Sequence, residues 1–234
     1  MENFAMLLKN YRKPGCEESK VAIIDDGVDA AHGSLSRNIA DGKSFSKGHG
    51  GLYSSYYKST RGHGTIMATL IRKVCPDARL YVAKLDEKRT DNGLEITADS
   101  AVEAIRWAIS RKVHIISMSW TINETTRNKD AINELKSAIY DAEKLGILLF
   151  CSVSDQGVKK DVAFPASLNN VVFRIGAATV YGDTWKWVGT DEADVDFILP
   201  GTRLRVDTRD PVAKSVKPCS KARWRQRSRQ ALPP

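Results

Sequence analysis

Three polar clusters in this chain combine residue types that could carry acid–base or nucleophilic chemistry. The first, IIDDGVD at residues 23–29, places two aspartates directly after an apolar run. The second, RGHGTIMATLI at 61–71, holds His63 between two glycines at the start of a segment of helical period. The third, FCSVSDQG at 150–157, ends another apolar run on Ser154 and Asp155. Carboxylate, imidazole and hydroxyl groups that meet at one site could move protons and activate a nucleophile.

Each cluster alone also has a simpler structural explanation. Asp-Gly pairs form turns, and two adjacent acids after a first strand would also suit a magnesium or phosphoryl-acceptor site. An isolated histidine is more often structural than catalytic. The glycines beside His63 favour catalysis, because they remove bulk next to the ring and allow unusual backbone angles. A helix N-terminus at this position would keep the imidazole neutral.

The elements that must position these clusters follow from the hydrophobic pattern. Short apolar runs rich in β-branched residues alternate with segments of helical period. We expect strands over 21–24, 80–85, 113–118, 147–152, 171–175 and 195–199, and helices over 65–74, 98–111 and 129–145. Such strands suit a doubly wound α/β domain, with a mostly parallel sheet and helices on both faces. Ligands of these sheets bind at the carboxyl ends of the strands, where the polar clusters fall.

Composition and charge limit the classes of function that this chain could have. The formal net charge is +8, but five of the basic residues lie in 221–229, so residues 1–220 carry only +3. The four cysteines are widely spread, which argues against a zinc site or a disulfide scaffold. We find no signal peptide and no apolar run long enough to span a membrane. The expected setting is intracellular and cytoplasmic, without a membrane partner.

The clusters together resemble the motifs of the subtilisin-like serine proteases (subtilases). VAIIDDGVD is similar to the Asp motif of that family. RGHGTIMATLI is similar to the His motif, with its Gly-His-Gly-Thr core, and the spacing from Asp25 to His63 fits. IISMSW, FPASLNNVVFRIGAAT and VDFILPG resemble further family blocks, so the similarity covers about residues 20–201. The residues of these motifs are most similar to those of intracellular fungal subtilase-like domains, which often occur inside larger multidomain chains.

The resemblance implies a subtilisin-like fold that hydrolyses peptide bonds with an Asp/His/Ser triad. It assigns Asp25, rather than Asp26, as the residue that orients His63, and His63 as general base and then general acid. It places Ser119 on the edge that pairs with an extended peptide. The implied partner is a peptide or protein substrate, and no nucleic acid is expected. No cofactor is implied, and calcium is left open.

Two positions depart from the family pattern. Asp155 stands where most subtilases have an oxyanion-hole asparagine, and an ionised aspartate cannot donate the hydrogen bond that this position supplies. No Gly-Thr-Ser-x-Ala or Gly-Ser-Ser-x-Ala element follows Pro200-Gly201. Ser220 is a weak candidate nucleophile, because Ala222 follows it but no glycine precedes it.

The basic segment 221–234 occupies the region where the nucleophile element is expected. We divide the chain into a lead-in (1–19), an incomplete subtilase-like domain (20–220) without the nucleophile helix, and this aberrant tail. Back-translation of the tail with CGN for Arg and TCN for Ser, read two bases in, permits Ser-Ser-Val-Ala-Thr-Ala-Leu-Ala-Ala-Gly-Leu-Ala-Ala. This reading is compatible with the Ser-Ser-x-Ala part of the family's nucleophile element followed by an apolar helix. The tail is therefore interpreted as an out-of-frame reading, and the chain as inactive in its written form.

Three other functions compete with an active peptidase. A pseudoprotease or peptide-binding module would keep the groove without the nucleophile. A phosphoryl- or nucleotide-binding domain could use Asp25 and Asp26, but it leaves Gly-His-Gly-Thr unexplained, and no glycine-rich phosphate loop follows the first strand. The arginines of the tail could bind nucleic acid electrostatically.

Overall fold

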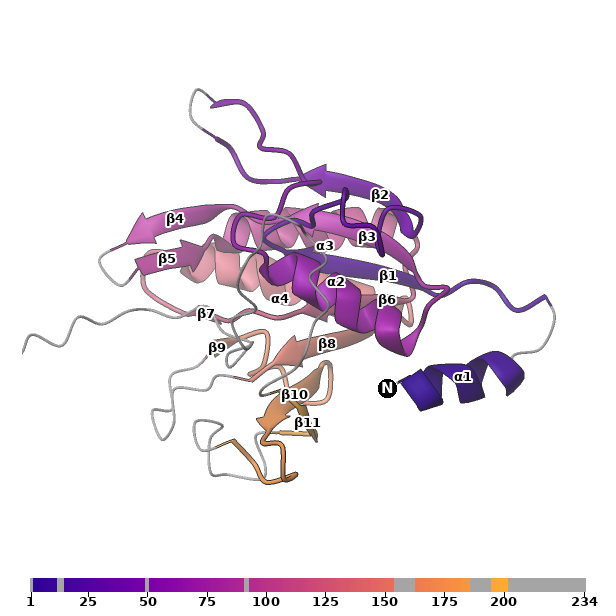
Figure 1. The fold of residues 1–234 in the computed structure, drawn as a ribbon. Helices are drawn as coiled ribbons and strands as arrows, with labels where there is room; N and C mark the ends of the chain where they lie inside the picture. Colours follow the sequence, from indigo (N-terminus) through magenta and orange to yellow (C-terminus); the bar gives the residue numbers. More distant parts are fainter. Residues whose placement is uncertain are drawn as a thin grey trace, which may run out of the picture.

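The computed structural model describes residues 2–11, 15–48, 51–90, 93–153, 163–185 and 195–201. Its centre is a seven-stranded sheet with the strand order β11-β10-β8-β6-β1-β3-β2 (Figure 1). Every neighbouring pair in this sheet is parallel. The expected α/β architecture with a mostly parallel sheet is therefore confirmed.

The bounds of the elements are as follows. The sheet strands are β1 (Lys20–Asp25), β2 (Ile39–Ser44), β3 (Arg79–Lys84), β6 (Ile115–Met118), β8 (Leu148–Ser152), β10 (Phe173–Ala178) and β11 (Phe197–Pro200). The helices are α1 (Glu2–Tyr11), α2 (His63–Val74), α3 (Ala98–Ser110) and α4 (Lys129–Lys144). Two small antiparallel ribbons pair β4 (Glu87–Thr90) with β5 (Gly93–Ile96), and β7 (Ile122–Asn123) with β9 (Ala163–Phe164).

The six expected strands and three expected helices are all present, with shifts of a few residues at their ends. The sequence pattern did not predict α1, β2 or the two ribbons. Strand β2, IADGKS, lacks an apolar run and owes its extended form to pairing with β3. Such strands are stabilised by their neighbours rather than by local propensity.

Helices cover both faces of the sheet around β1. Ala22 and Ile24 belong to the core cluster that contains α3 and α4, whereas Val21 and Ile23 pack in the smaller cluster beneath α2. Successive side chains of a strand point to opposite faces, so β1 is buried on both sides. This burial explains its uninterrupted apolar sequence.

The parallel register brings the carboxyl ends of three strands to one edge. Asp25 at the end of β1 pairs with Lys84 of β3, and Ile24 pairs with Met118 of β6. The buried indole of Trp120 donates from Nε1 to the carbonyl oxygen of Ile24 at 2.9 Å. This bond ties the segment after β6 to the end of β1, next to Asp25.

Over β8, β10 and β11, the α2 side of the sheet presents mainly apolar side chains, and no described helix covers it. Phe150 stacks on Phe173 with ring centroids 5.0 Å apart, and Phe173 lies 6.1 Å from Phe197. Phe197 and Leu199 are 50% and 51% exposed. No helix of the described chain packs on this apolar surface, which we call the bare face (Figure 1).

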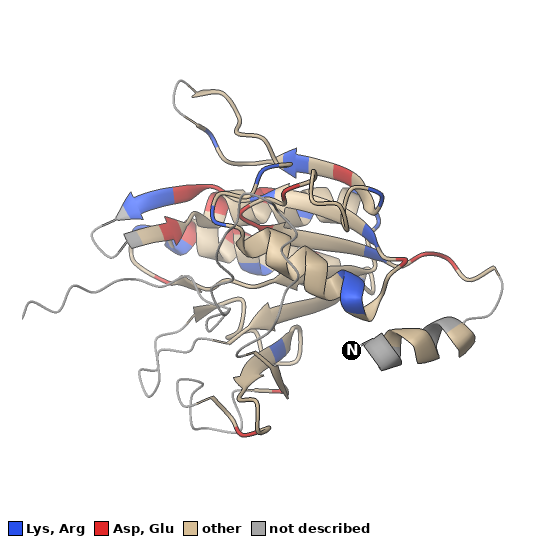
Figure 2. Cartoon of the chain, viewed as in Figure 1, with Lys and Arg blue, Asp and Glu red and all other residues tan. Residues whose placement is uncertain are grey.

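The described surface mixes both signs of charge. Acidic and basic residues occur together on β2, which carries Asp41 and Lys43, and on the β4–β5 ribbon, which carries Glu87, Lys88, Arg89 and Glu95 (Figure 2). This mixture matches the net charge of only +3 over residues 1–220. Among the described helices, none is both long and apolar enough to cross a membrane.

Candidate active site

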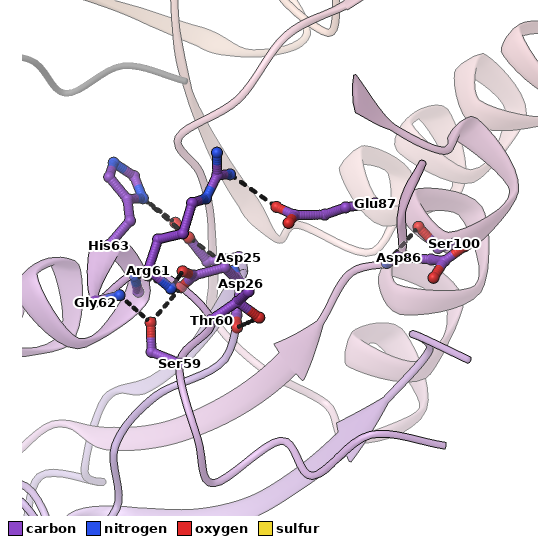
Figure 3. Close-up of polar contacts among 11 residues, drawn as sticks. Asp25, Asp26, Ser59, Thr60, Arg61, Gly62, His63, Asp86, Glu87 and Ser100 are labelled. Atoms are coloured by element: carbon purple, nitrogen blue, oxygen red, sulfur yellow. Dashed lines mark hydrogen bonds and ion pairs between the residues drawn. The ribbon is translucent and has the colours of Figure 1, made fainter. Parts of the chain in front are cut away.

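Asp25 and His63 form a hydrogen-bonded pair at the carboxyl edge of the sheet. Nδ1 of His63 lies 2.9 Å from both carboxylate oxygens of Asp25 (Figure 3). Asp25 ends β1 and is 1% exposed, and His63 is the first residue of α2, with a side chain that is 12% exposed. Nε2, the other ring nitrogen, is buried and has no hydrogen-bond partner among the described residues. The ring thus presents one nitrogen to the carboxylate and leaves the other for a reacting group.

The two glycines beside His63 serve different steric needs. Gly62 has a φ of 82°, a left-handed conformation that side chains other than glycine rarely adopt. Gly64 packs against the turn after β1, where an added Cβ would lie 2.2 Å from the carbonyl oxygen of Gly27. A side chain at either position would displace the start of α2, and with it the imidazole.

Burial and the contact with Asp25 act in opposite directions on the pKa of His63. Burial lowers the pKa of His63, but the charge and hydrogen bond of Asp25 outweigh this, and Asp26 adds to them, so the pKa ends above its ordinary value. The direction of this shift is opposite to the one expected from the helix N-terminus alone, which favours the neutral imidazole. A carboxylate in direct contact acts more strongly than the partial charge at a helix end.

An ion pair that the sequence pattern did not predict lies beside this site. Arg61 Nη2 contacts Glu87 Oε1 at 2.7 Å and joins the loop before α2 to the start of β4 (Figure 3). The two residues are 26 positions apart; Arg61 begins the segment that carries His63, but Glu87 belongs to none of the motifs described above. Burial raises the pKa of Glu87 to about 7; Arg61 opposes this rise, while the charges of Asp26 and Asp25 add to it.

The raised pKa of Glu87 makes stability depend on pH. The folded protein binds more protons here than the unfolded chain, whose glutamate keeps an ordinary pKa near 4.5. We therefore expect the contribution of Glu87 to the free energy of unfolding to fall as the pH rises from about 4.5 to about 7, and to stay constant above that range. Glu87→Gln should remove this fall, because an amide does not titrate. Urea denaturation of both proteins at about pH 5 and about pH 8 measures the difference.

Glu124→Gln provides the matched control for that experiment. Glu124 also pairs with a basic side chain, Lys136 at 3.4 Å, but both are 30% exposed. Its substitution should leave the pH dependence as it is in the unaltered chain. Equal pH dependence in the unaltered chain and in Glu87→Gln would show that Glu87 titrates in its ordinary range.

The remaining predicted site residues are placed as follows. Ser119 directly follows β6 and is partly buried, at the same sheet edge as Asp25. Asp155 and Ser220 lie outside the described residues. In the described part of the chain, no group of three or more His, Cys, Asp or Glu side chains is arranged to hold a metal ion.

Comparison with known proteins identifies the family. The model of the subtilase family, the peptidase S8 group, matches residues 17–227, which is most of the chain. The chain belongs to the subtilase family. The Asp25–His63 pair therefore lies in a serine protease domain.

Two curated relatives illustrate the range of this similarity. The major intracellular serine protease of Bacillus subtilis is 27% identical over 198 residues, which cover 79% of this chain and 58% of that protein. The subtilisin-like protease het-Q2 of Podospora anserina is 37% identical over 107 residues, covering 45% of this chain and 29% of that protein. The chain thus spans less than two thirds of either relative.

Solved structures support the same fold. A lanthipeptide protease superimposes with a TM-score of 0.69 at 20% identity, covering 86% of this chain and 60% of the other. The nisin leader peptidase of Lactococcus lactis gives a TM-score of 0.67 at 19% identity, covering 83% and 64%. These matches establish that the subtilase arrangement of strands and helices extends over most of this chain.

Proposed function

We propose that this chain is the Asp/His part of a serine-type endopeptidase. The observation that carries the proposal is the contact of the His63 imidazole with both carboxylate oxygens of a buried Asp25. In the proposed reaction, Nε2 of His63 takes the proton of a serine hydroxyl as it attacks the scissile carbonyl. His63 then returns the proton to the leaving amine, and Asp25 stabilises the imidazolium in between.

The proposed substrate is an extended segment of peptide or protein. Ser119 follows β6 at the edge that carries Asp25, and main-chain hydrogen bonds there would give affinity for many sequences. Two relatives are named as intracellular serine proteases, which supports the same location for this protein. A larger multidomain protein around this domain is also proposed, because the relatives are longer.

We further propose that the nucleophile is missing from these 234 residues and that the written chain is inactive. No glycine-led Ser-x-Ala element follows Pro200-Gly201. The bare face of β8, β10 and β11 supports this view, because exposed Phe197 and Leu199 need an apolar partner element. The alternative reading of the codons for 221–234 would supply a small-residue, apolar helix of the kind that fits such a surface.

A pseudoprotease or peptide-binding module is the second candidate function. The missing nucleophile element also favours this function, because the sheet edge with Ser119 and the Asp25–His63 pair would remain in its absence. A fluorophosphonate probe separates the two, because it reacts covalently with an activated serine. Labelling of the natural gene product at one serine would support the peptidase; its absence in a product that still binds peptides would support the module.

Asp155 is expected to weaken catalysis even where a nucleophile is present. Asp155→Asn in a complete version should raise kcat for peptide hydrolysis by about 100- to 1000-fold at neutral pH, because the amide donates to the oxyanion and the carboxylate repels it. Asp161→Asn removes a charge six residues away and serves as the control. Equal kcat values for Asp155→Asn and the unaltered enzyme would show that Asp155 does not lie at the oxyanion site.

The written chain is expected to be poorly soluble or partly molten. At about 25 cal/mol per Å2 of apolar area, a buried helix contributes many kcal/mol, against a typical total stability of about 5–15 kcal/mol. Thermal unfolding followed by near-UV circular dichroism should be broad, with binding of a hydrophobic dye before the transition. A sharp, cooperative transition in the purified chain would contradict the absence of a core element.

A further inference from the structure

Asp26, the second aspartate of the turn after β1, makes contacts that the proposed role of Asp25 does not explain. The residue is only 1% exposed. Its Oδ1 accepts hydrogen bonds from the Ser59 hydroxyl at 2.7 Å and the Gly64 N–H at 2.8 Å. Its Oδ2 accepts from the Arg61 N–H at 2.7 Å (Figure 3). Three donors therefore converge on one buried carboxylate.

These donors lie on both sides of His63 in the chain. Arg61 precedes His63 by two residues, and Gly64 follows it directly. The Ser59 hydroxyl, which donates to Asp26, in turn accepts from the N–H of Gly62 at 2.7 Å. The carboxylate thus fixes the backbone before and after the residue that carries the imidazole.

The main chain of Asp26 fixes the other member of the pair. Its N–H donates to Oδ1 of Asp25 at 2.8 Å, and this oxygen also accepts from Nδ1 of His63. One residue therefore orients the carboxylate through its backbone and the imidazole through its side chain.

We propose that Asp26 is a positioning residue that sets the alignment of the His63 ring with Asp25. Its importance for catalysis rests on the proposed function, whereas the alignment itself does not. A carboxylate suits this place because it accepts several hydrogen bonds and donates none. An asparagine would turn its NH2 group toward one of the backbone donors and leave buried groups without partners.

The test uses a complete version of the domain, in which codons 221–234 are read in the alternative frame, with isotope-labelled histidines, whose four side chains give few NMR signals. Asp26→Asn changes both charge and geometry, whereas Ser59→Ala breaks the link to the loop without changing charge. Ser59→Thr keeps the hydroxyl and serves as the rescue variant. Asp29→Asn is the matched control, because Asp29 accepts from the Ser59 N–H at 2.9 Å and the Thr65 hydroxyl at 3.2 Å and so holds the same loop elsewhere.

The readout is the proton on Nδ1 of His63, which is protected only while the ring is aligned with Asp25. Asp26→Asn and Ser59→Ala should speed its exchange with water about tenfold or more, the factor expected from loss of one hydrogen bond to a charged group. Ser59→Thr should restore slow exchange, and Asp29→Asn should change it little. A residue that only stabilised the fold would not change the exchange rate of the His63 Nδ1 proton selectively.

Several results would overturn the proposal. An effect of Asp29→Asn on His63 as large as that of Asp26→Asn would make the Asp26 carboxylate a general support of the loop. An unprotected Nδ1 proton in the complete version without substitutions, or unchanged exchange in Ser59→Ala, would contradict the proposal directly. If Asp26→Asn does not fold, Ser59→Ala and Ser59→Thr decide the question. The proposed peptidase function is judged separately, by fluorophosphonate labelling, which does not enter the NMR result.

Discussion

Restoring the alternative reading frame from codon 221 onward is expected to turn this chain into a peptidase. The gain in kcat should be about a million-fold, because subtilase-type catalysis depends on the serine and histidine acting as one unit. The restored segment would place two serines after Ser220, the second of them in a Ser-Val-Ala element, and follow them with an apolar helix. Hydrolysis of a fluorogenic peptide by the written chain and by the restored protein measures the gain.

The matched control for this gain is the restored protein with alanine in place of the serine of its new Ser-Val-Ala element. It keeps the apolar helix, so it separates catalysis from the recovery of the fold. It should melt like the restored protein and hydrolyse as slowly as the written chain. Equal hydrolysis by this alanine version and the restored protein would show that the serine is not the nucleophile.

Removing the charge of Asp25 is expected to have the second largest effect. In the restored protein, Asp25→Asn should lower kcat by about ten-thousand-fold, because the amide favours the wrong tautomer of His63 and cannot stabilise its imidazolium. The change should also lower the pKa of His63, since Asp25 is the main group that raises it. A kcat–pH profile and an NMR titration of His63 measure the two effects.

Asp29→Asn serves as the control for Asp25→Asn as well. Asp29 lies four residues further along the same turn and holds Ser59 and Thr65 rather than His63. Its substitution should leave kcat near that of the restored protein. A loss of similar size in both variants would mean that the turn, and not the carboxylate facing His63, is what the enzyme needs.

The sequence predicted the parts of the fold that depend on hydrophobic pattern. The strand ending at Asp25 and the helix beginning near His63 both follow from apolar runs with clear ends. Strand β2 could not be found in this way, because its Asp41-Gly42-Lys43 stretch becomes a strand only by pairing with β3. Local pattern predicts elements that bury their own apolar face, and it misses those that depend on a neighbour.

In the candidate site, too, the features set by local sequence were predictable and those set by folding were not. The pairing of Asp25 with His63 was predictable, because both lie in motifs of fixed order and spacing. Glu87 was not, since its raised pKa results from burial beside residues that come from three separate segments. Asp26 looked like an ordinary turn residue, and only the folded chain brings Ser59 and Gly64 to its carboxylate.

The proposal that residues 221–234 stand where a subtilase nucleophile belongs can be decided by the transcript sequence across codons 220–234. We expect another frame there to encode Ser-x-Ala followed by a run of small apolar residues. A transcript in which no frame encodes such an element would contradict the claim and leave this chain as a subtilase-like domain that never had its serine at this place.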